Sequence, residues 1–192
     1  MNTEIIVLTD RSGSMTTICQ DAIGGFAAFI EEQKKMSGDV RITQIMFDDQ
    51  IETQYQALPL DQTPELTLEP RGMTALLDAI GTALNVQGKR IHDEDWADLV
   101  IVVIITDGGE NASREYTASQ IKEMISHAEK HNWKFVFLAA NQDAFQTGAQ
   151  YGISAQFTSN FDATPSGTRT AYAAMSASVS NLRAGLNQVP DL

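Results

Sequence analysis

The feature that most constrains the fold is the alternation of short, almost wholly apolar runs with longer helical patterns. The most hydrophobic run, residues 99–106 (LVIVVIIT), has no polar residue before its final Thr. Such runs are typical of strands buried on both faces, as in the middle of a parallel sheet. Strands separated by helices predict βαβ units. We therefore expect an α/β fold: a doubly wound, Rossmann-like sheet, mostly parallel, with helices on both faces in three layers.

The remaining elements follow from the same periodicities. Residues 51–57 alternate apolar and polar side chains after an Asp-Asp turn, so 40–47 and 51–57 predict an antiparallel hairpin at the sheet edge with one exposed face. The sequence TASQ from Thr117 is a capping box that predicts the start of a helix. Other strands are expected at 4–9, 135–140 and, more weakly, 153–158, and other helices at 18–35, 75–86 and 166–186.

Length and composition predict one domain over residues 1–192, because no linker or internal repeat divides the chain. A single Cys cannot form an internal disulfide, so a reducing, cytoplasmic location is expected. No apolar run approaches the roughly 20 residues needed to span a bilayer. Strand-like sequence begins at about Glu4, so no signal peptide and no membrane association are expected.

The charge is acidic and unevenly placed. The chain has 13 Lys and Arg against 25 Asp and Glu, a formal net charge of −12. Residues 1–115 hold 20 of the acidic and 8 of the basic residues, whereas the rest holds 5 of each. An acidic surface repels phosphate backbones, so we expect no nucleic-acid partner, whereas cations are favoured.

Three segments rich in oxygen ligands follow or adjoin the predicted central strands: residues 10–14 (DRSGS), 72–74 (GMT) and 106–108 (TDG). Ligands of such sheets bind beyond the carboxyl ends of the strands, so these segments are expected to meet there. Carboxylate and hydroxyl oxygens suit Mg²⁺, Mn²⁺ or Ca²⁺ and are poor ligands for Zn²⁺ or Cu²⁺. The candidate ligands are Asp10, Ser12, Ser14, Thr74 and Asp107.

The motif D-x-S-x-S after the first strand, a Thr before a later helix and T-D-G after a hydrophobic strand together resemble a von Willebrand factor A domain. In that family the matching positions form the metal-ion-dependent adhesion site. The resemblance implies that Ser12 and Ser14 bind the metal through their hydroxyls, that Asp10 and Asp107 bind it directly or through water, and that Thr74 approaches or retreats as ligand binds. It also implies a protein partner that presents a Glu or Asp to the metal, and a regulatory role for the last helix, residues 166–186.

Several residues near these motifs have simpler interpretations. The Arg11 side chain is expected to point into solvent. Asp78 lies in the first turn of a predicted helix, where the helix dipole favours an acid, and Glu110 is expected to be a solvated loop acid. His127 and His131 are four residues apart, but no third zinc ligand is evident, so we expect a solvent-facing helix end.

Enzymatic motifs are mostly absent: the chain has no phosphate-binding P-loop, no G-x-G-x-x-G after the first strand and no G-x-S-x-G. We therefore expect a non-enzymatic, metal-dependent protein-binding module. The alternative is a Mg²⁺-dependent phosphohydrolase or phosphotransferase that uses Asp10 as its nucleophile, as in haloacid-dehalogenase-like phosphatases. Those enzymes need a second Asp two residues later, where this chain has Ser12.

Overall fold

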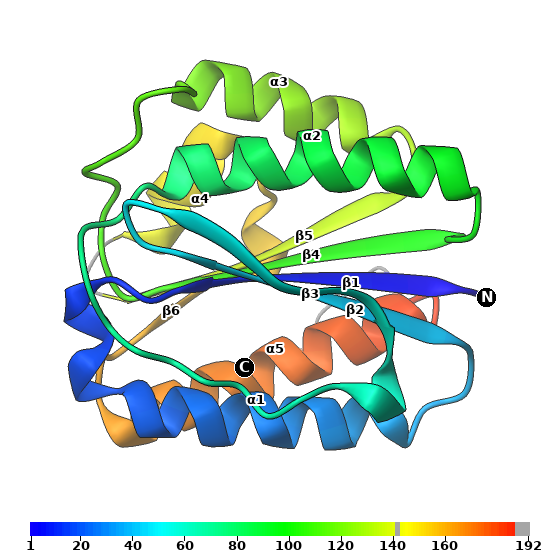
Figure 1. Cartoon of the computed structure of the whole chain (residues 1–192), viewed down its shortest axis with the longest axis horizontal. Helices are drawn as coiled ribbons and strands as arrows, with labels where there is room; N and C mark the ends of the chain where they lie inside the picture. Colours follow the sequence, from blue (N-terminus) through cyan, green and yellow to red (C-terminus); the bar gives the residue numbers. More distant parts are fainter. Residues whose placement is uncertain (141–142, 187–192) are drawn as a thin grey trace.

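A computed structural model describes residues 1–140 and 143–186, and it contains a six-stranded sheet (Figure 1). The strand order is β3-β2-β1-β4-β5-β6, and every neighbouring pair is parallel except β2 with β3. The expected three-layer, mostly parallel α/β fold with an antiparallel edge is therefore confirmed. The strands are β1 Thr3–Asp10, β2 Val40–Phe47, β3 Ile51–Pro59, β4 Leu99–Thr106, β5 Trp133–Ala140 and β6 Thr158–Phe161.

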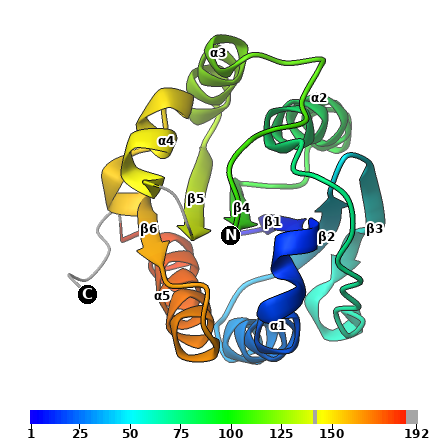
Figure 2. The same ribbon diagram turned by 90° about the vertical axis from the view of Figure 1, so that its left-hand side faces the viewer.

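In the described part of the chain, five α-helices cover the two faces of the sheet. The helices α2, α3 and α4 lie on one face and α1 and α5 on the other (Figures 1 and 2). Because successive side chains of a strand point to opposite faces, Ile5 and Val7 of β1 pack toward α1 and α5, whereas Ile6 and Leu8 pack toward α2 and α3. Within the described ranges, no helix has the length and apolarity that crossing a bilayer requires. The helices are α1 Cys19–Lys34, α2 Leu76–Glu94, α3 Ala118–Glu129, α4 Ala144–Tyr151 and α5 Pro165–Arg183.

The strand order reverses beside β1, which pairs with β2 on one side and with β4 on the other. The register aligns Thr9 with Ile105, so β1 and β4 end at the same level of the sheet. The carboxyl ends of the parallel strands face the viewer in Figure 2, where the loops after β1 and β4 lie side by side. This reversal is the place at which open α/β sheets bind their ligands.

Three elements differ from the sequence-based expectation. The α2 helix continues beyond residue 86 to Glu94, because Ile91 still faces the core. The last strand is β6 and not residues 153–158: Ile153 is buried against the α2 side of the sheet from a loop, so its apolar character gave a false strand signal. The short α4 was not predicted. It begins at the capping residue Asp143 and ends before Gly152, whose φ is +85°.

The capping box at the start of α3 is confirmed. The Thr117 hydroxyl accepts a hydrogen bond from the Gln120 amide at 3.3 Å, and the Gln120 side chain accepts one from the Thr117 amide at 2.9 Å. The capping box therefore marks where the α3 chain turns from loop to helix.

Candidate metal centre

The centre is built on Asp10, the last residue of β1, whose side chain is fully buried. Its Oδ1 accepts a hydrogen bond from the Ser12 amide at 2.6 Å, which turns the chain sharply as it leaves the strand. Its Oδ2 accepts one from the Thr106 hydroxyl at 2.6 Å, which ties the end of β1 to the end of β4. An acceptor side chain that bonds the amide two residues ahead stabilises such a turn.

Ser12, Ser14 and Asp107 form a chain of oxygen atoms across the two strand ends. The Ser12 and Ser14 hydroxyls lie 3.0 Å apart, and the Ser14 hydroxyl donates to Asp107 Oδ1 at 2.6 Å. Ser12 and Asp107 are buried, whereas Ser14 is exposed. The oxygen cluster is therefore open to solvent on the Ser14 side.

Thr74 completes the set from the loop before α2. It is 3% exposed, and its backbone is held by Asn111: the Thr74 amide donates to Asn111 Oδ1 at 2.9 Å, and the Asn111 amide donates to the Thr74 carbonyl at 3.0 Å. A Cβ at Gly108 would lie 3.4 Å from Ser14 Oγ and 3.5 Å from Thr74 Oγ1, so both hydroxyls flank this glycine. The structure thus brings all five residues singled out by the sequence to one end of the sheet.

The electrostatics of the site favour a cation. Burial raises the pKa of Asp10 to about 6, against the lowering effect of its hydrogen bonds with Thr106 and Ser12, and burial also raises the pKa of Asp107. Two carboxylates removed from water are unfavourable in their ionised form unless a positive charge compensates them. With three hydroxyls, these oxygens form a hard donor set that fits a divalent ion such as Mg²⁺ or Mn²⁺.

Sequence patterns for metal sites usually rely on several acids, imidazoles or thiolates. Across residues 1–140 and 143–186, no group of three or more His, Cys, Asp or Glu side chains is arranged to hold a metal ion. Thr106 and Asn111 position Asp10 and Thr74. The sequence motifs include Thr106 but assign neither residue this role, although both lie in the strand end and loop that carry Asp107.

The expectation for Arg11 is wrong. Its side chain is buried, and its Nε donates to Asp48 Oδ2 at 2.9 Å while its Nη1 donates to Glu52 Oε2 at 2.9 Å. The two carboxylates come from the turn between β2 and β3 and from β3, and β2 lies between β3 and β1 in the sheet, so they approach Arg11 only in the folded protein. A pairing between such distant segments leaves no local sequence signal.

Asp78 lies in the first turn of α2, as expected, and Glu110 differs from its expected role. Asp78 is 8% exposed and also acts as a structural acceptor that fastens the loop after β4 to α2. Glu110 is not simply solvated, because it accepts a hydrogen bond from the Leu77 amide at 2.9 Å and so caps the start of α2. The Asp78 carboxylate accepts from the amides of Arg114, Glu115 and Tyr116 at 2.8–2.9 Å.

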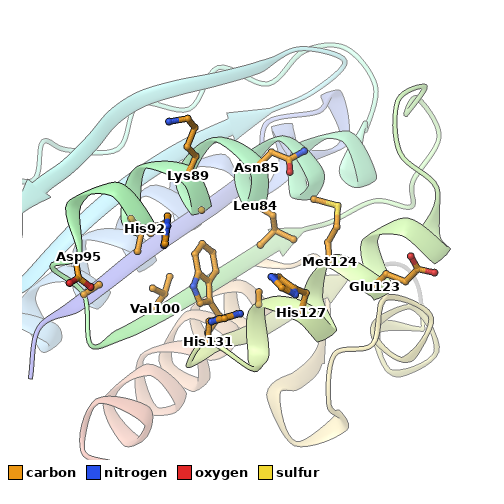
Figure 3. A pocket seen from close by; sticks show the side chains of 15 residues that line it. Leu84, Asn85, Lys89, His92, Asp95, Val100, Glu123, Met124, His127 and His131 are labelled. Carbon is orange, nitrogen blue, oxygen red and sulfur yellow. The ribbon is translucent and has the colours of Figure 1, made fainter.

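A groove lies far from the oxygen cluster of the candidate metal centre. It has a volume of about 880 Å³ and lies between the carboxyl-terminal halves of α2 and α3, near the residues that begin β4 and β5 (Figure 3). All three His residues of the chain, His92, His127 and His131, line it over an apolar floor. His127 and His131 are exposed with ring centroids 4.9 Å apart, as expected for a solvent-facing helix end, and they form no part of the oxygen cluster.

No protein-family model matches the sequence, and the comparison with curated proteins gives no match either. Solved structures do resemble this one. Proximal thread matrix protein 1 from the mussel byssus, in a form described as having a zinc-occupied metal-ion-dependent adhesion site motif, is 12% identical with a TM-score of 0.69. Manganese-loaded TRAP protein from Plasmodium vivax is 16% identical with a TM-score of 0.60, and a von Willebrand factor type A structure from Catenulispora acidiphila is 16% identical with a TM-score of 0.61.

The matches cover 91%, 84% and 92% of this chain, but only 45%, 68% and 42% of the mussel, Plasmodium and Catenulispora chains. The chain therefore spans less than half the length of two of these proteins. Identities this low establish a shared fold, that of von Willebrand factor type A domains, and nothing about shared ligands.

Proposed function

We propose that this protein is a divalent-cation-dependent protein-binding module, with Asp10, Ser12, Ser14, Thr74 and Asp107 as the metal site. The observation that carries the proposal is the convergence of these five side chains, from three separate loops, at the point where the strand order reverses. Mg²⁺ or Mn²⁺ is the proposed ion, because the donors are all oxygen. The zinc and manganese reported for two structural neighbours are consistent with a divalent ion in this fold.

In this proposal the chain's residues have distinct tasks. Ser12 and Ser14 offer neutral hydroxyls from one tight turn, and Asp10 orients that turn through the Ser12 amide. Asp107 supplies the second negative charge and is already within hydrogen-bonding distance of Ser14. A bound ion would supply a positive centre that the two carboxylates only just neutralise, and Ser14 marks the solvent-open side from which an acidic partner residue would approach.

The net charge of −12 predicts that the cation binds before the partner does. An acidic protein surface repels an acidic partner, so the partner should bind only once the cation is present. We also propose a cytoplasmic location, based on the single Cys. The last helix, α5, is a candidate regulatory element by analogy with the fold family alone.

The test is a quantitative pull-down with Mg²⁺ or with EDTA, using wild type, Ser12→Ala/Ser14→Ala and the matched control Thr17→Ala, an exposed hydroxyl in the same segment. The proposal predicts a partner retained by wild type and Thr17→Ala in Mg²⁺ only, and lost when the partner's Glu or Asp is replaced. Binding that persists in EDTA would contradict it. Mg²⁺-dependent hydrolysis of phosphoesters that disappears in Asp10→Ala would favour the phosphohydrolase instead.

A further inference from the structure

Beside the proposed metal site lies a cluster of four charged side chains, Arg11, Asp48, Glu52 and Arg71, here called the ion-pair cluster. Asp48 is fully buried and Arg11 is 6% exposed, whereas Glu52 and Arg71 lie nearer the surface. Both guanidinium groups reach both carboxylates. Arg11 Nε and Arg71 Nε lie 2.9 and 2.7 Å from Asp48 Oδ2, and Arg11 Nη2 and Arg71 Nη2 both lie 2.8 Å from Glu52 Oε1.

The two cations and two carboxylates of the ion-pair cluster cancel. Arg11 directly follows the proposed ligand Asp10, yet its charge is compensated within its own contacts. An uncompensated guanidinium at this position would repel a divalent ion, whereas a compensated one leaves the ion's surroundings nearly unchanged. The ion-pair cluster therefore adds no net charge beside the proposed metal site.

Main-chain hydrogen bonds show what the ion-pair cluster connects. The Arg71 amide donates to the Arg11 carbonyl at 2.7 Å, and the Arg11 amide donates to the Phe47 carbonyl at 2.8 Å. The Ala75 amide donates to the Asp48 carbonyl at 2.8 Å. Arg11 and Ala75, the residues next to Asp10 and Thr74, are thus bonded to two adjacent residues, Phe47 at the end of β2 and Asp48 in the β2–β3 turn.

We propose that the ion-pair cluster positions the metal site: Arg11 and Arg71 hold the Asp10–Ser14 turn and the Thr74 loop against the β2–β3 turn and so set the affinity for the cation. This inference rests on the proposed metal site. It assigns Arg11 and Arg71 as positioning residues, which do not touch the ion. Groups that orient metal ligands typically change the metal affinity by about 10- to 100-fold when removed.

Positioning and simple electrostatics predict opposite signs. Removing a positive charge close to a cation site should tighten metal binding if charge were the only effect. If Arg11 and Arg71 position the ligands, removing either side chain should weaken metal binding, because the loops lose their fixed spacing. Substitution by Met keeps most of the side-chain length and removes only the charged head.

The experiment measures the dissociation constants of Mg²⁺ and Mn²⁺ by calorimetric titration for wild type, Arg11→Met and Arg71→Met. The matched control is Arg90→Met, because Arg90 pairs with the buried Glu4 of the same strand β1, at its other end, at 2.5 Å. Thermal unfolding of each variant is recorded to confirm that binding is measured on folded protein. Arg71 is half exposed, so its variant keeps the test valid should Arg11→Met fail to fold.

We expect the dissociation constant to rise about tenfold in Arg11→Met and severalfold in Arg71→Met, and to stay within about twofold of wild type in Arg90→Met. Unchanged or tighter binding in both Arg11→Met and Arg71→Met overturns the positioning proposal while leaving the metal site intact. Weaker binding of the same size in Arg90→Met also overturns it, since any lost ion pair would then have that effect. A wild type that binds neither ion overturns the proposed function itself.

Discussion

Replacing the Asp10 carboxylate by an amide, in Asp10→Asn, should make the metal-free protein more stable and abolish its response to metal. The carboxylate is fully buried, and its pKa is raised from 3.8 to about 6 by burial. The folded state therefore prefers the neutral acid, and ionisation at pH 7 opposes folding by about 3 kcal/mol, since a tenfold change in an equilibrium constant is about 1.4 kcal/mol. The amide is a neutral isostere that removes this penalty.

The net gain is smaller than the full penalty, because the amide has one acceptor oxygen where the carboxylate has two. The side chain can still accept from the Ser12 amide, and its NH₂ group can donate to the Thr106 hydroxyl. A gain of about 1–3 kcal/mol is expected, which for a chain of this size raises the Tm by about 2–12 °C. The difference in stability between Asp10→Asn and wild type should disappear below pH 4, where Asp10 is protonated in the folded and the unfolded state. In wild type, the protonated Asp10 carries no ionisation penalty at low pH, and this stability is lost as pH rises through the folded-state pKa of about 6.

The assay is thermal unfolding in EDTA and in excess Mg²⁺. An ion at 100 times its dissociation constant should stabilise wild type by about 2.7 kcal/mol and leave Asp10→Asn unchanged. The matched control is Asp78→Asn, which removes another buried carboxylate, but one that accepts three main-chain amides. That variant should lose about 1–3 kcal/mol, since one amide is left without a partner, and should still respond to Mg²⁺. An Asp10→Asn protein that is less stable than wild type in EDTA would show that the buried carboxylate does not oppose folding.

Three further predictions concern the site and the fold. Mg²⁺ affinity should fall steeply between pH 7 and pH 5 as Asp10, with its pKa near 6, takes up a proton; a flat titration profile would contradict this. Gly72→Ala should weaken Mg²⁺ binding, because Gly72 has φ +68° and a Cβ there would lie 2.1 Å from Asp49 Oδ1. If calorimetry gave an unchanged affinity, the Thr74 loop would tolerate the added methyl group. Gly81→Ala should destabilise the protein by about 1–3 kcal/mol in urea unfolding, because its Cβ would lie 2.6 Å from the Tyr116 ring. An unchanged free energy of unfolding would mean that the ring moves aside at no cost.

The fold could be predicted where hydrophobic periodicity reports how a strand is buried. The uninterrupted apolar run forms β4, which is buried along its whole length, and the alternating run forms the partly exposed edge strand β3. Both strands lie where expected. Ile153 shows where hydrophobic periodicity fails, because a buried apolar residue in a loop gives the same sequence pattern as one in a strand. The eight-residue α4 was missed because it is too short for its periodicity to stand out.

Four of the candidate ligands could be predicted because they lie at or just after the ends of β1 and β4, which topology brings together, whereas Thr74 comes from the loop before α2. Their supporting residues could not. The sequence alone predicts a solvent-exposed Arg11, because Asp48 and Glu52 come close to it only in the folded sheet. It likewise predicts a solvated Glu110, because the hydrogen bond from the Leu77 amide at the start of α2 joins two distant segments. The candidate ligands can thus be proposed from local motifs, whereas the contacts that hold them depend on pairings between distant segments.

A calorimetric titration of Mn²⁺ into wild type and into Ser12→Ala/Ser14→Ala tests the proposed metal site directly. This double variant keeps every acidic residue of the chain, so loose binding to the acidic surface would remain. We expect one saturable ion per wild-type chain and no saturable binding in the variant, because the two hydroxyls are part of the donor set. Equal binding by both proteins would show that the hydroxyls hold no metal and that the proposed site is wrong.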